Sequence, residues 1–200
     1  PLVFRALQFF ERLSCRLADH VIATNHSYRA MEMERGGVPA ERITVVRNAP
    51  DPKRMRLVDP DPQLRQSGKA IIGYVGALGA QDGLDYLLRA LRHLVYDLGR
   101  TDFYCVIVGK GDTLPALRQL ATELRIDDYV HFTGWVSDDD LLRYLSSADI
   151  CVDPDPKNPF NDRSTMIKMM EYMALAKPIV AFDLTEHRVT AQDAAVYARP

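Results

Sequence analysis

The sequence predicts an α/β protein with a Rossmann-like parallel sheet that carries helices on both faces. From residue 70 onward, apolar strand-like runs alternate with amphipathic helical segments, which is the order of repeated βαβ units. The strand-like runs are apolar at nearly every position, as expected for strands that are buried on both faces. Gly, Pro or Asp bounds each run, which indicates short connections.

The expected elements follow one another in a regular order. Residues 1–50 predict a helix, a strand at 19–25, a second helix and a strand at 42–48. Residues 51–69 are rich in Pro and Asp, have no clean period and are typical of a linker. The alternating region predicts strands at 70–76, 103–109, 129–135, 149–154, 178–182 and 194–198, helices at 82–99, 114–125, 138–148 and 164–176, and a short helical stretch after residue 182.

Composition limits the class of protein. Hydrophobic residues make up 47% and charged residues 26%, which fits a globular domain with a sizeable core. The net charge of −2 gives no basic field for nucleic acid, and no apolar run approaches the ~20 residues that span a bilayer. Cys105 and Cys151 fall inside strand-like runs, so we expect small buried side chains in a reducing compartment, the cytoplasm.

In parallel sheets, ligands bind beyond the carboxyl ends of the strands, so the loops after the strands are the candidate sites. The first loop is rich in glycine, including Gly76 and Gly79, and either cradles a phosphate or makes a tight turn. Asp82 is expected to cap the helix that follows. The glycine spacing is not that of a dinucleotide site.

The next two loops offer a cation and an aromatic ring. Lys110 lies between two glycines and either points at an anion or is an exposed turn residue. In the following loop Gly134 opens a turn, and Ser137 or Asp138 caps the next helix. Trp135 either stacks on a base or covers the edge of the sheet.

An Asp-x-Asp pair, Asp153 and Asp155, follows a core strand and has the spacing that can hold a metal bridged to a diphosphate. We nevertheless expect no metal and no cofactor. The five histidines suggest no ligand cluster, and His187 is expected to be a solvated loop residue.

Lys168 and Glu171 lie three residues apart on a predicted helix, either as a surface ion pair or as part of a ligand site. Their place after the fourth regular strand favours the ligand site.

The motifs "VVRNAPD", "GYVGALGAQDGLDYLLRAL", "VIVGKGD", "VHFTGWVSDDDLLRYLSSADICVDP", "KMMEYMALAKPIVAFD" and "TEH" stand in an order and spacing that resembles the retaining glycosyltransferases of family 4. The resemblance implies a GT-B fold of two Rossmann-like domains, of which the C-terminal one binds a nucleoside-diphosphate sugar. Both ends of the sequence look cut, so we expect a fragment: residues 1–50 from the acceptor domain, the linker 51–69, and a donor domain 70–200 that lacks its final helices.

The resemblance also assigns roles to single residues. Glu171 matches the family's second glutamate of E-x7-E, which accepts hydrogen bonds from ribose hydroxyls. The segment of Ser164, Thr165 and Met166 matches the one whose backbone N–H groups meet the diphosphate. The turn of Gly134, Trp135 and Val136 matches the loop that holds the nucleobase, and Gly76, Gly79 and their neighbours match the loop near the phosphates and the sugar.

The sequence departs from the family at three positions. Arg163 stands where the first glutamate belongs, and Ala77 and Asp82 replace the usual cationic pair on the diphosphate. Ser164, Lys168, Glu171 and Tyr172 fit the pattern of one branch of the family. We therefore expect Arg163, Lys168 or Lys110 to supply the positive charge.

The resemblance thus implies a metal-independent glycosyltransferase that moves a hexose-like group, with retention, onto a glycan or lipid acceptor during polysaccharide or glycolipid synthesis. We expect no nucleic-acid partner and a cytoplasmic location. Peripheral association with the inner face of the membrane is compatible with this location, through the missing N-terminal domain. No catalytic residue is predicted, and the fragment alone is not expected to turn over. Two alternatives remain: an inactive homologue that binds a nucleotide or a partner, and a sugar-nucleotide epimerase of the same fold.

Overall fold

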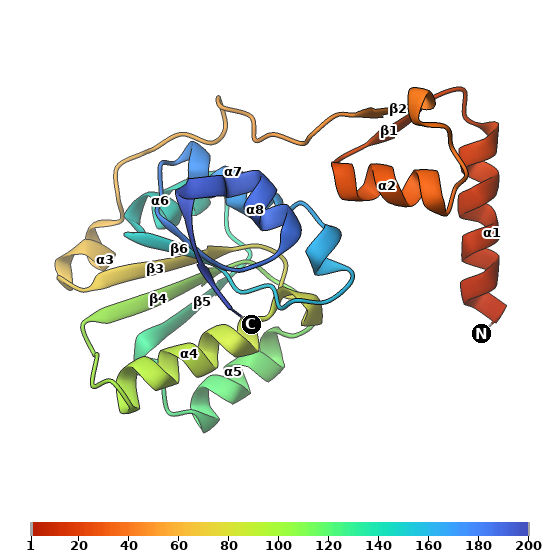
Figure 1. Ribbon diagram of the computed structural model, residues 1–200. Helices are drawn as coiled ribbons and strands as arrows, with labels where there is room; N and C mark the ends of the chain where they lie inside the picture. Colours follow the sequence, from red (N-terminus) through yellow and green to blue (C-terminus); the bar gives the residue numbers. More distant parts are fainter. Residues whose placement is uncertain (1, 200) are drawn as a thin grey trace.

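The computed structural model describes residues 2–199 and contains two parallel sheets (Figure 1). The smaller sheet pairs β1 (Val21–Ala23) with β2 (Ile43–Val45). The larger sheet has the order β5-β4-β3-β6-β7-β8, and its strands are β3 (Ala70–Val75), β4 (Phe103–Val108), β5 (Val130–Gly134), β6 (Ile150–Asp153), β7 (Ile179–Phe182) and β8 (Ala195–Ala198). All six strands run parallel, which confirms the predicted Rossmann-like sheet.

The strand order places a topological switch point between β3 and β6. The chain builds the sheet outward from β3 to β5 and then returns to place β6 on the other side of β3. Loops that leave β3 and β6 therefore diverge and leave a crevice at the carboxyl ends of these strands, where ligands bind in doubly wound sheets. Tyr172 ties the two strands together there, because its hydroxyl accepts from the Val75 N–H at 3.0 Å and donates to the Val152 carbonyl at 3.3 Å.

Helices cover both faces of the larger sheet, as predicted (Figure 1). On one face, α4 (Leu84–Tyr96) and α5 (Leu114–Glu123) bury Leu84, Leu88 and Leu117 against the strands. On the other face, α6 (Asp138–Ser147) and α7 (Ile167–Ala174) bury Leu142, Leu145 and Met169. Cys105 and Cys151 are fully buried, which confirms the expectation for these side chains. The series closes with α8 (Thr185–Ala191) before β8.

The N-terminal part consists of α1 (Leu2–Leu17) and α2 (His26–Glu34) beside the two-stranded sheet. A segment without strands leads from there to β3, and it holds the short helix α3 (Pro62–Gln66), which the linker prediction did not include. Asp61 caps α3 by accepting from the Gln63 and Leu64 N–H groups. One-turn 3-10 helices complete the chain: η1 (Ala40–Arg42), η2 (Ala80–Asp82), η3 (Asp127–Tyr129), η4 (Asn161–Arg163) and η5 (Gln192–Ala194).

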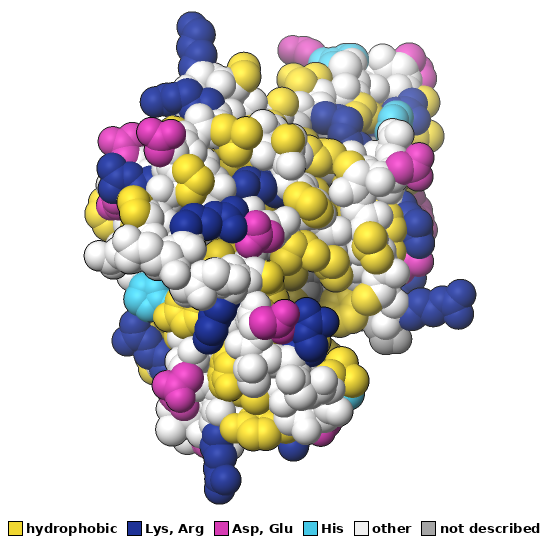
Figure 2. All heavy atoms as spheres, turned by 90° about the vertical axis from the view of Figure 1, so that its left-hand side faces the viewer, with side chains coloured by type: hydrophobic (Ala, Val, Ile, Leu, Met, Phe, Trp, Pro, Cys, Tyr) yellow, Lys and Arg dark blue, Asp and Glu magenta, His cyan; other side chains and the backbone are white. Residues whose placement is uncertain are grey.

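The surface carries charges of both signs. In Figure 2, Lys and Arg side chains are interspersed with Asp and Glu side chains over the face shown, and apolar side chains gather around a hollow. An apolar hollow of about 320 Å³ lies on the sheet beside α4, where Ile72, Val152 and Val180 from the strands face Tyr86 and Leu94 from the helix. Within residues 2–199, no helix combines the length and the hydropathy that crossing a bilayer requires.

Candidate donor-binding site

A pocket of about 310 Å³ opens at the carboxyl ends of β3, β4 and β5. It brings together four residues that the sequence predicted for the site, from three different loops: Gly76, Lys110, Trp135 and Val136. The other lining residues are Arg54, Val75, Ala77, Val108, Gly109, Asp138 and Leu141. The pocket therefore lies at the end of the sheet where ligands of such folds bind.

Two glycines allow the loops after β3 and β4 to pack against each other. A Cβ atom at Gly109 would lie 1.9 Å from the Gly76 carbonyl oxygen, and one at Gly111 would lie 2.3 Å from the Leu78 carbonyl oxygen. The Leu78 N–H donates to the Lys110 carbonyl at 3.1 Å, so the loops are also joined through their backbones. Close packing of the two backbones leaves the Lys110 side chain exposed at the edge of the pocket.

Trp135 lines the same pocket. Gly134 turns the chain there with a φ of +71°, and Ser137 then caps α6 by accepting from the Asp140 N–H at 3.2 Å, as predicted. The indole is 73% exposed, so it does not cover the edge of the sheet. Its face remains available for stacking.

Arg54 is a pocket residue that the sequence did not indicate. Its guanidinium donates to the Asp138 carboxylate at 2.8 Å, which fixes the linker across the start of α6. The sequence predicted only a linker here, and the signal that could have indicated Arg54 is the cluster of basic residues from Lys53 to Arg56. Arg54 and Lys110 thus place two cations on the pocket wall, where the sequence lacks the family's usual pair at Ala77 and Asp82.

Glu171 lies near this pocket without lining it. The side chain is half-buried on α7; burial raises the pKa of its carboxyl group, and the nearby Arg54 charge lowers it in part. Tyr172, the next residue, anchors α7 to the end of β3. Glu171 forms no ion pair with Lys168 within the described chain, so the surface-pair interpretation is wrong.

The segment before α7 is not helical, although the sequence predicted a helix from residue 164. The one-turn helix η4 ends at Arg163, the Ser164 N–H donates back to the Asn161 carbonyl at 3.1 Å, and α7 begins only at Ile167. The Ser164 N–H is therefore already bonded. Met166, at the N-cap, makes no side-chain capping bond, although its carbonyl accepts from the Met169 N–H at 3.3 Å, so the N-terminus of α7 has no side-chain cap.

Side chains from the N-terminal part hold this segment. The Asn25 amide nitrogen donates to the Arg163 carbonyl at 2.8 Å and to the Thr165 hydroxyl at 2.9 Å. The hydroxyls of Tyr28 and Ser164 lie 2.8 Å apart. The Arg163 side chain is exposed and does not line the pocket.

Glu186 makes a second connection between the two parts. Its carboxylate accepts from the Ser27 hydroxyl at 2.6 Å and lies 3.8 Å from the Arg47 guanidinium. The same carboxylate is 3.4 Å from the Thr165 hydroxyl. The loop before α7, the start of α8 and the N-terminal part therefore share one polar network.

Lys168 points away from the pocket, into a buried cluster at the switch point. Its ammonium lies 3.0 Å from Asp155 Oδ1, 3.3 Å from Asp153 Oδ1 and 3.5 Å from Asp82 Oδ1. Burial lowers the pKa of Lys168, but the carboxylates raise it above its ordinary value on balance. The ammonium is thus engaged by protein carboxylates, and this geometry does not direct it to a phosphate, as the sequence had suggested.

Asp82 also differs from its prediction. Its carboxylate accepts from the Gly79 N–H at 2.9 Å and faces Lys168, while α4 begins at Leu84 with Gly83 as its N-cap residue and no side-chain cap. The expected capping role of Asp82 is therefore wrong. The Gly79 N–H is likewise occupied by this bond.

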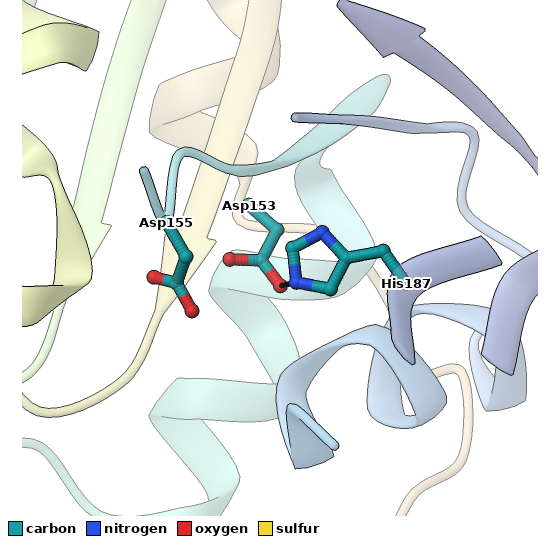
Figure 3. A group of neighbouring side chains, drawn as sticks. All are labelled: Asp153, Asp155 and His187. Carbon is teal, nitrogen blue, oxygen red and sulfur yellow. Dashed lines mark ion pairs between the residues drawn. The ribbon is translucent and has the colours of Figure 1, made fainter. Parts of the chain in front are cut away.

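His187 completes the cluster (Figure 3). It belongs to α8 and is fully buried, so the expectation of a solvated loop histidine is wrong. Its Nε2 lies 3.5 Å from Asp153 Oδ2. Burial, with the neighbouring Asp153 charge, raises the pKa of Asp155 to about 7. Three carboxylates, one ammonium and one imidazole therefore meet at the carboxyl ends of β3, β6 and β7.

Comparison with known proteins agrees with this architecture. Residues 69–199 match the model of the family described as glycosyl transferases group 1. The chain belongs to this family. The match covers the whole of the larger sheet and begins just before β3.

Curated relatives include an uncharacterised glycosyltransferase of Methanocaldococcus jannaschii, 28% identical over 88% of this chain and 45% of its own length. The amylovoran biosynthesis glycosyltransferase AmsK of Erwinia amylovora is 29% identical over 77% of this chain and 38% of its own length. This chain spans less than half the length of these two relatives.

Solved structures share the fold. HepE of Anabaena, crystallised with UDP and glucose, superposes with a TM-score of 0.73 at 20% identity, over 96% of this chain and 54% of its own. WaaG, a glycosyltransferase involved in lipopolysaccharide biosynthesis, gives a TM-score of 0.71 at 17% identity, over 89% of this chain and 48% of its own. The GT-B fold predicted from the motifs is thus confirmed.

Proposed function

We propose that the protein of which this chain is part transfers a sugar, with retention, from a nucleoside-diphosphate sugar to a glycan or lipid acceptor. The observation that carries the proposal is the pocket at the carboxyl ends of β3, β4 and β5, which combines two cations with an exposed indole. Membership of the glycosyltransferase family and a structural relative crystallised with UDP and glucose support the same ligand class.

The walls of the pocket suit the parts of a nucleotide. Trp135 offers an aromatic face to the base, beside the turn at Gly134 and Val136. Glu171, which lies near the pocket without lining it, offers two carboxylate oxygens, which suit the two neighbouring hydroxyls of a ribose. The pKa of Glu171 is raised, and the carboxyl group becomes a stronger hydrogen-bond acceptor as it ionises.

Arg54 and Lys110 take the place of the missing cationic pair. Both line the pocket, and both carry charge that would stabilise a diphosphate as the glycosidic bond breaks. The start of α7, next to Thr165 and Met166, has no side-chain cap, and its N–H groups add donors for the same phosphates. In this proposal neither Lys168 nor Arg163 is needed as a phosphate ligand.

The names of two relatives support the kind of product. AmsK is named for amylovoran biosynthesis, and WaaG is described as acting in lipopolysaccharide biosynthesis. We infer that this protein acts in the synthesis of a polysaccharide or a glycolipid.

Isothermal calorimetry tests the proposal with UDP, GDP and ADP, each compared with its nucleoside. We expect one diphosphate to bind, and Arg54→Ala and Lys110→Ala each to weaken it by about 1 kcal/mol, roughly fivefold, because exposed charge pairs are worth that much at most. Each substitution should weaken binding of the nucleoside less than binding of the diphosphate. Arg56→Ala is the matched control, since Arg56 is an exposed neighbour that does not line the pocket. Absence of binding by all three diphosphates would refute the site.

A further inference from the structure

Three buried polar atoms near the switch point have no hydrogen-bond partner. They are Asp153 Oδ2, Asp155 Oδ2 and His187 Nε2, and each belongs to a residue that is 0% exposed. One possible ligand atom from each of the three side chains lies within 4.8 Å of the others, and Figure 3 shows the Asp153 carboxylate between the Asp155 carboxylate and the imidazole of His187. Unpaired buried polar atoms of this kind are rare in folded proteins and point to an absent partner.

The imidazole can be assigned its tautomer from its other nitrogen. His187 Nδ1 lies 3.0 Å from the Phe182 carbonyl oxygen, which can only accept, so Nδ1 carries the hydrogen. The neutral ring then presents the lone pair of Nε2 to Asp153 Oδ2 at 3.5 Å. Two acceptors that face each other repel, so the pair requires a positive group, either a proton or a cation.

Lys168 does not fill this role. Its ammonium contacts the Oδ1 atoms of Asp82, Asp153 and Asp155, and it leaves the Oδ2 atoms of the last two unpaired. One ammonium against three carboxylates leaves a formal charge of −2 in a buried site, which is costly. Because a neutral histidine adds no charge, one divalent cation would bring the formal charge of the site to zero.

We propose that Asp153, Asp155 and His187 bind a divalent first-row transition-metal cation such as Zn²⁺ or Mn²⁺. Two carboxylate oxygens and one imidazole nitrogen form a ligand set that these borderline cations accept, whereas Mg²⁺ prefers oxygen and water. Bonds of about 2.1 Å hold ligand atoms roughly 3 to 4 Å apart, so the widest pair needs to close by about 1 Å. The Phe182 carbonyl supplies the outer hydrogen bond that orients a metal-binding histidine.

The cation would serve the structure and not the chemistry of transfer. None of its three ligands lines the pocket between Arg54 and Trp135. It would join the loop that follows β6 to α8, which follows β7, and α8 also carries Glu186, the residue bonded to Ser27. The site thus fixes two neighbouring loops at the carboxyl edge of the sheet, and its existence does not depend on the proposed activity.

Metal analysis of the purified protein tests the site without any activity assay. After chelator treatment and dialysis, the protein is titrated with Zn²⁺, Mn²⁺, Co²⁺ and Mg²⁺. We expect one Zn²⁺ or Mn²⁺ per chain, a visible absorption band with Co²⁺, a higher melting temperature with each of these cations, and little response to Mg²⁺. Asp155→Asn and His187→Gln should lower the affinity by more than about tenfold, the loss that even an outer-shell partner can cause.

Two controls keep the test decisive. His93→Gln removes an exposed histidine of α4 that pairs with Asp97, and it should leave metal binding unchanged. Circular dichroism establishes that the variants are folded, and Asp155→Asn keeps the shape of the side chain if His187→Gln does not fold. Absence of bound cation in the unaltered chain, or equal affinity in Asp155→Asn, would overturn the proposal and assign a proton to the space between Asp153 and His187.

Discussion

Replacing Lys168 with methionine removes the ammonium that faces Asp82, Asp153 and Asp155 while keeping a similar volume. The lysine side chain is 9% exposed, and those of Asp153 and Asp155 are 0% exposed, so water cannot replace the lost charge. Removing one partner of a buried ion pair typically costs about 3–5 kcal/mol. The cluster would hold three carboxylates and no ammonium.

The cost has an upper limit, because a carboxylate can take up a proton instead of remaining charged. Protonating an aspartate whose ordinary pKa is 3.8 costs about 4 kcal/mol at pH 7 and about 2 kcal/mol at pH 5. We therefore expect Lys168→Met to lower the free energy of unfolding by about 3–4 kcal/mol at pH 7 and by clearly less at pH 5.

The sign follows from linkage. Loss of Lys168 raises the folded-state pKa of Asp155 further above its unfolded value, because the ammonium of Lys168 lowers that pKa in the unaltered chain. A raised folded-state pKa contributes stability that is present below the unfolded pKa and is lost as the pH rises through the folded pKa. The same holds for Asp155 in the unaltered chain, from about pH 4 through its pKa of about 7. The variant should therefore lose stability more steeply as the pH rises.

Urea unfolding followed by circular dichroism measures the effect at pH 5 and pH 7, with chelator present so that no bound cation compensates. Lys110→Met is the matched control, because Lys110 is exposed, and its effect should stay within about 0.5 kcal/mol. A loss below about 1 kcal/mol at pH 7, or an equal loss at both pH values, would refute the description of the cluster as a buried charge site.

Two further variants test the pocket and the loops behind it. Glu171→Gln should weaken nucleoside-diphosphate binding by about 1–3 kcal/mol, since it removes a charged acceptor. Calorimetry across pH should show affinity that rises through the raised pKa of Glu171 in the unaltered chain and a flatter profile in the variant. Gly83→Ala should destabilise the fold in urea by more than about 1 kcal/mol, because Gly83 has a φ of +62° and a Cβ there would lie 2.0 Å from the Pro154 carbonyl oxygen. Gly99→Ala is the control, because Gly99 has a similar φ of +64° but open space around it. Its loss of stability measures the cost of the backbone conformation alone, without a steric clash.

The sequence predicted the sheet well because its signal is local. Each strand of the larger sheet is a continuous apolar run between turn residues, and the structure places a strand at all six predicted positions. The start of α7 was wrong because the residues after η4 are helix-compatible by composition but are held extended by contacts with Asn25 and Tyr28, 136 to 140 residues earlier. Such distant partners leave no trace in periodicity.

The same reasoning explains which site residues the sequence missed. Lys168 lies three residues from Glu171, which suggested a shared ligand, but its actual partners lie 13, 15 and 86 residues away. Arg54 reaches the pocket only because the linker crosses the start of α6, where Asp138 pairs with it 84 residues later. Positions of polar side chains depend on which loops the topology brings together, whereas strand positions depend on the apolar pattern alone.

The Asn25 side chain links the N-terminal part of the molecule to the loop before α7. Its amide oxygen caps α2 by accepting from the Tyr28 N–H at 2.7 Å, while its amide nitrogen donates to the loop before α7. Ser or Asp would cap the helix equally well, but neither could both accept at one atom and donate at the other in this way. Asn25→Asp would therefore preserve α2 and set a carboxylate against the Arg163 carbonyl, which separates the folding of the N-terminal part from its alignment with the part that contains the larger sheet.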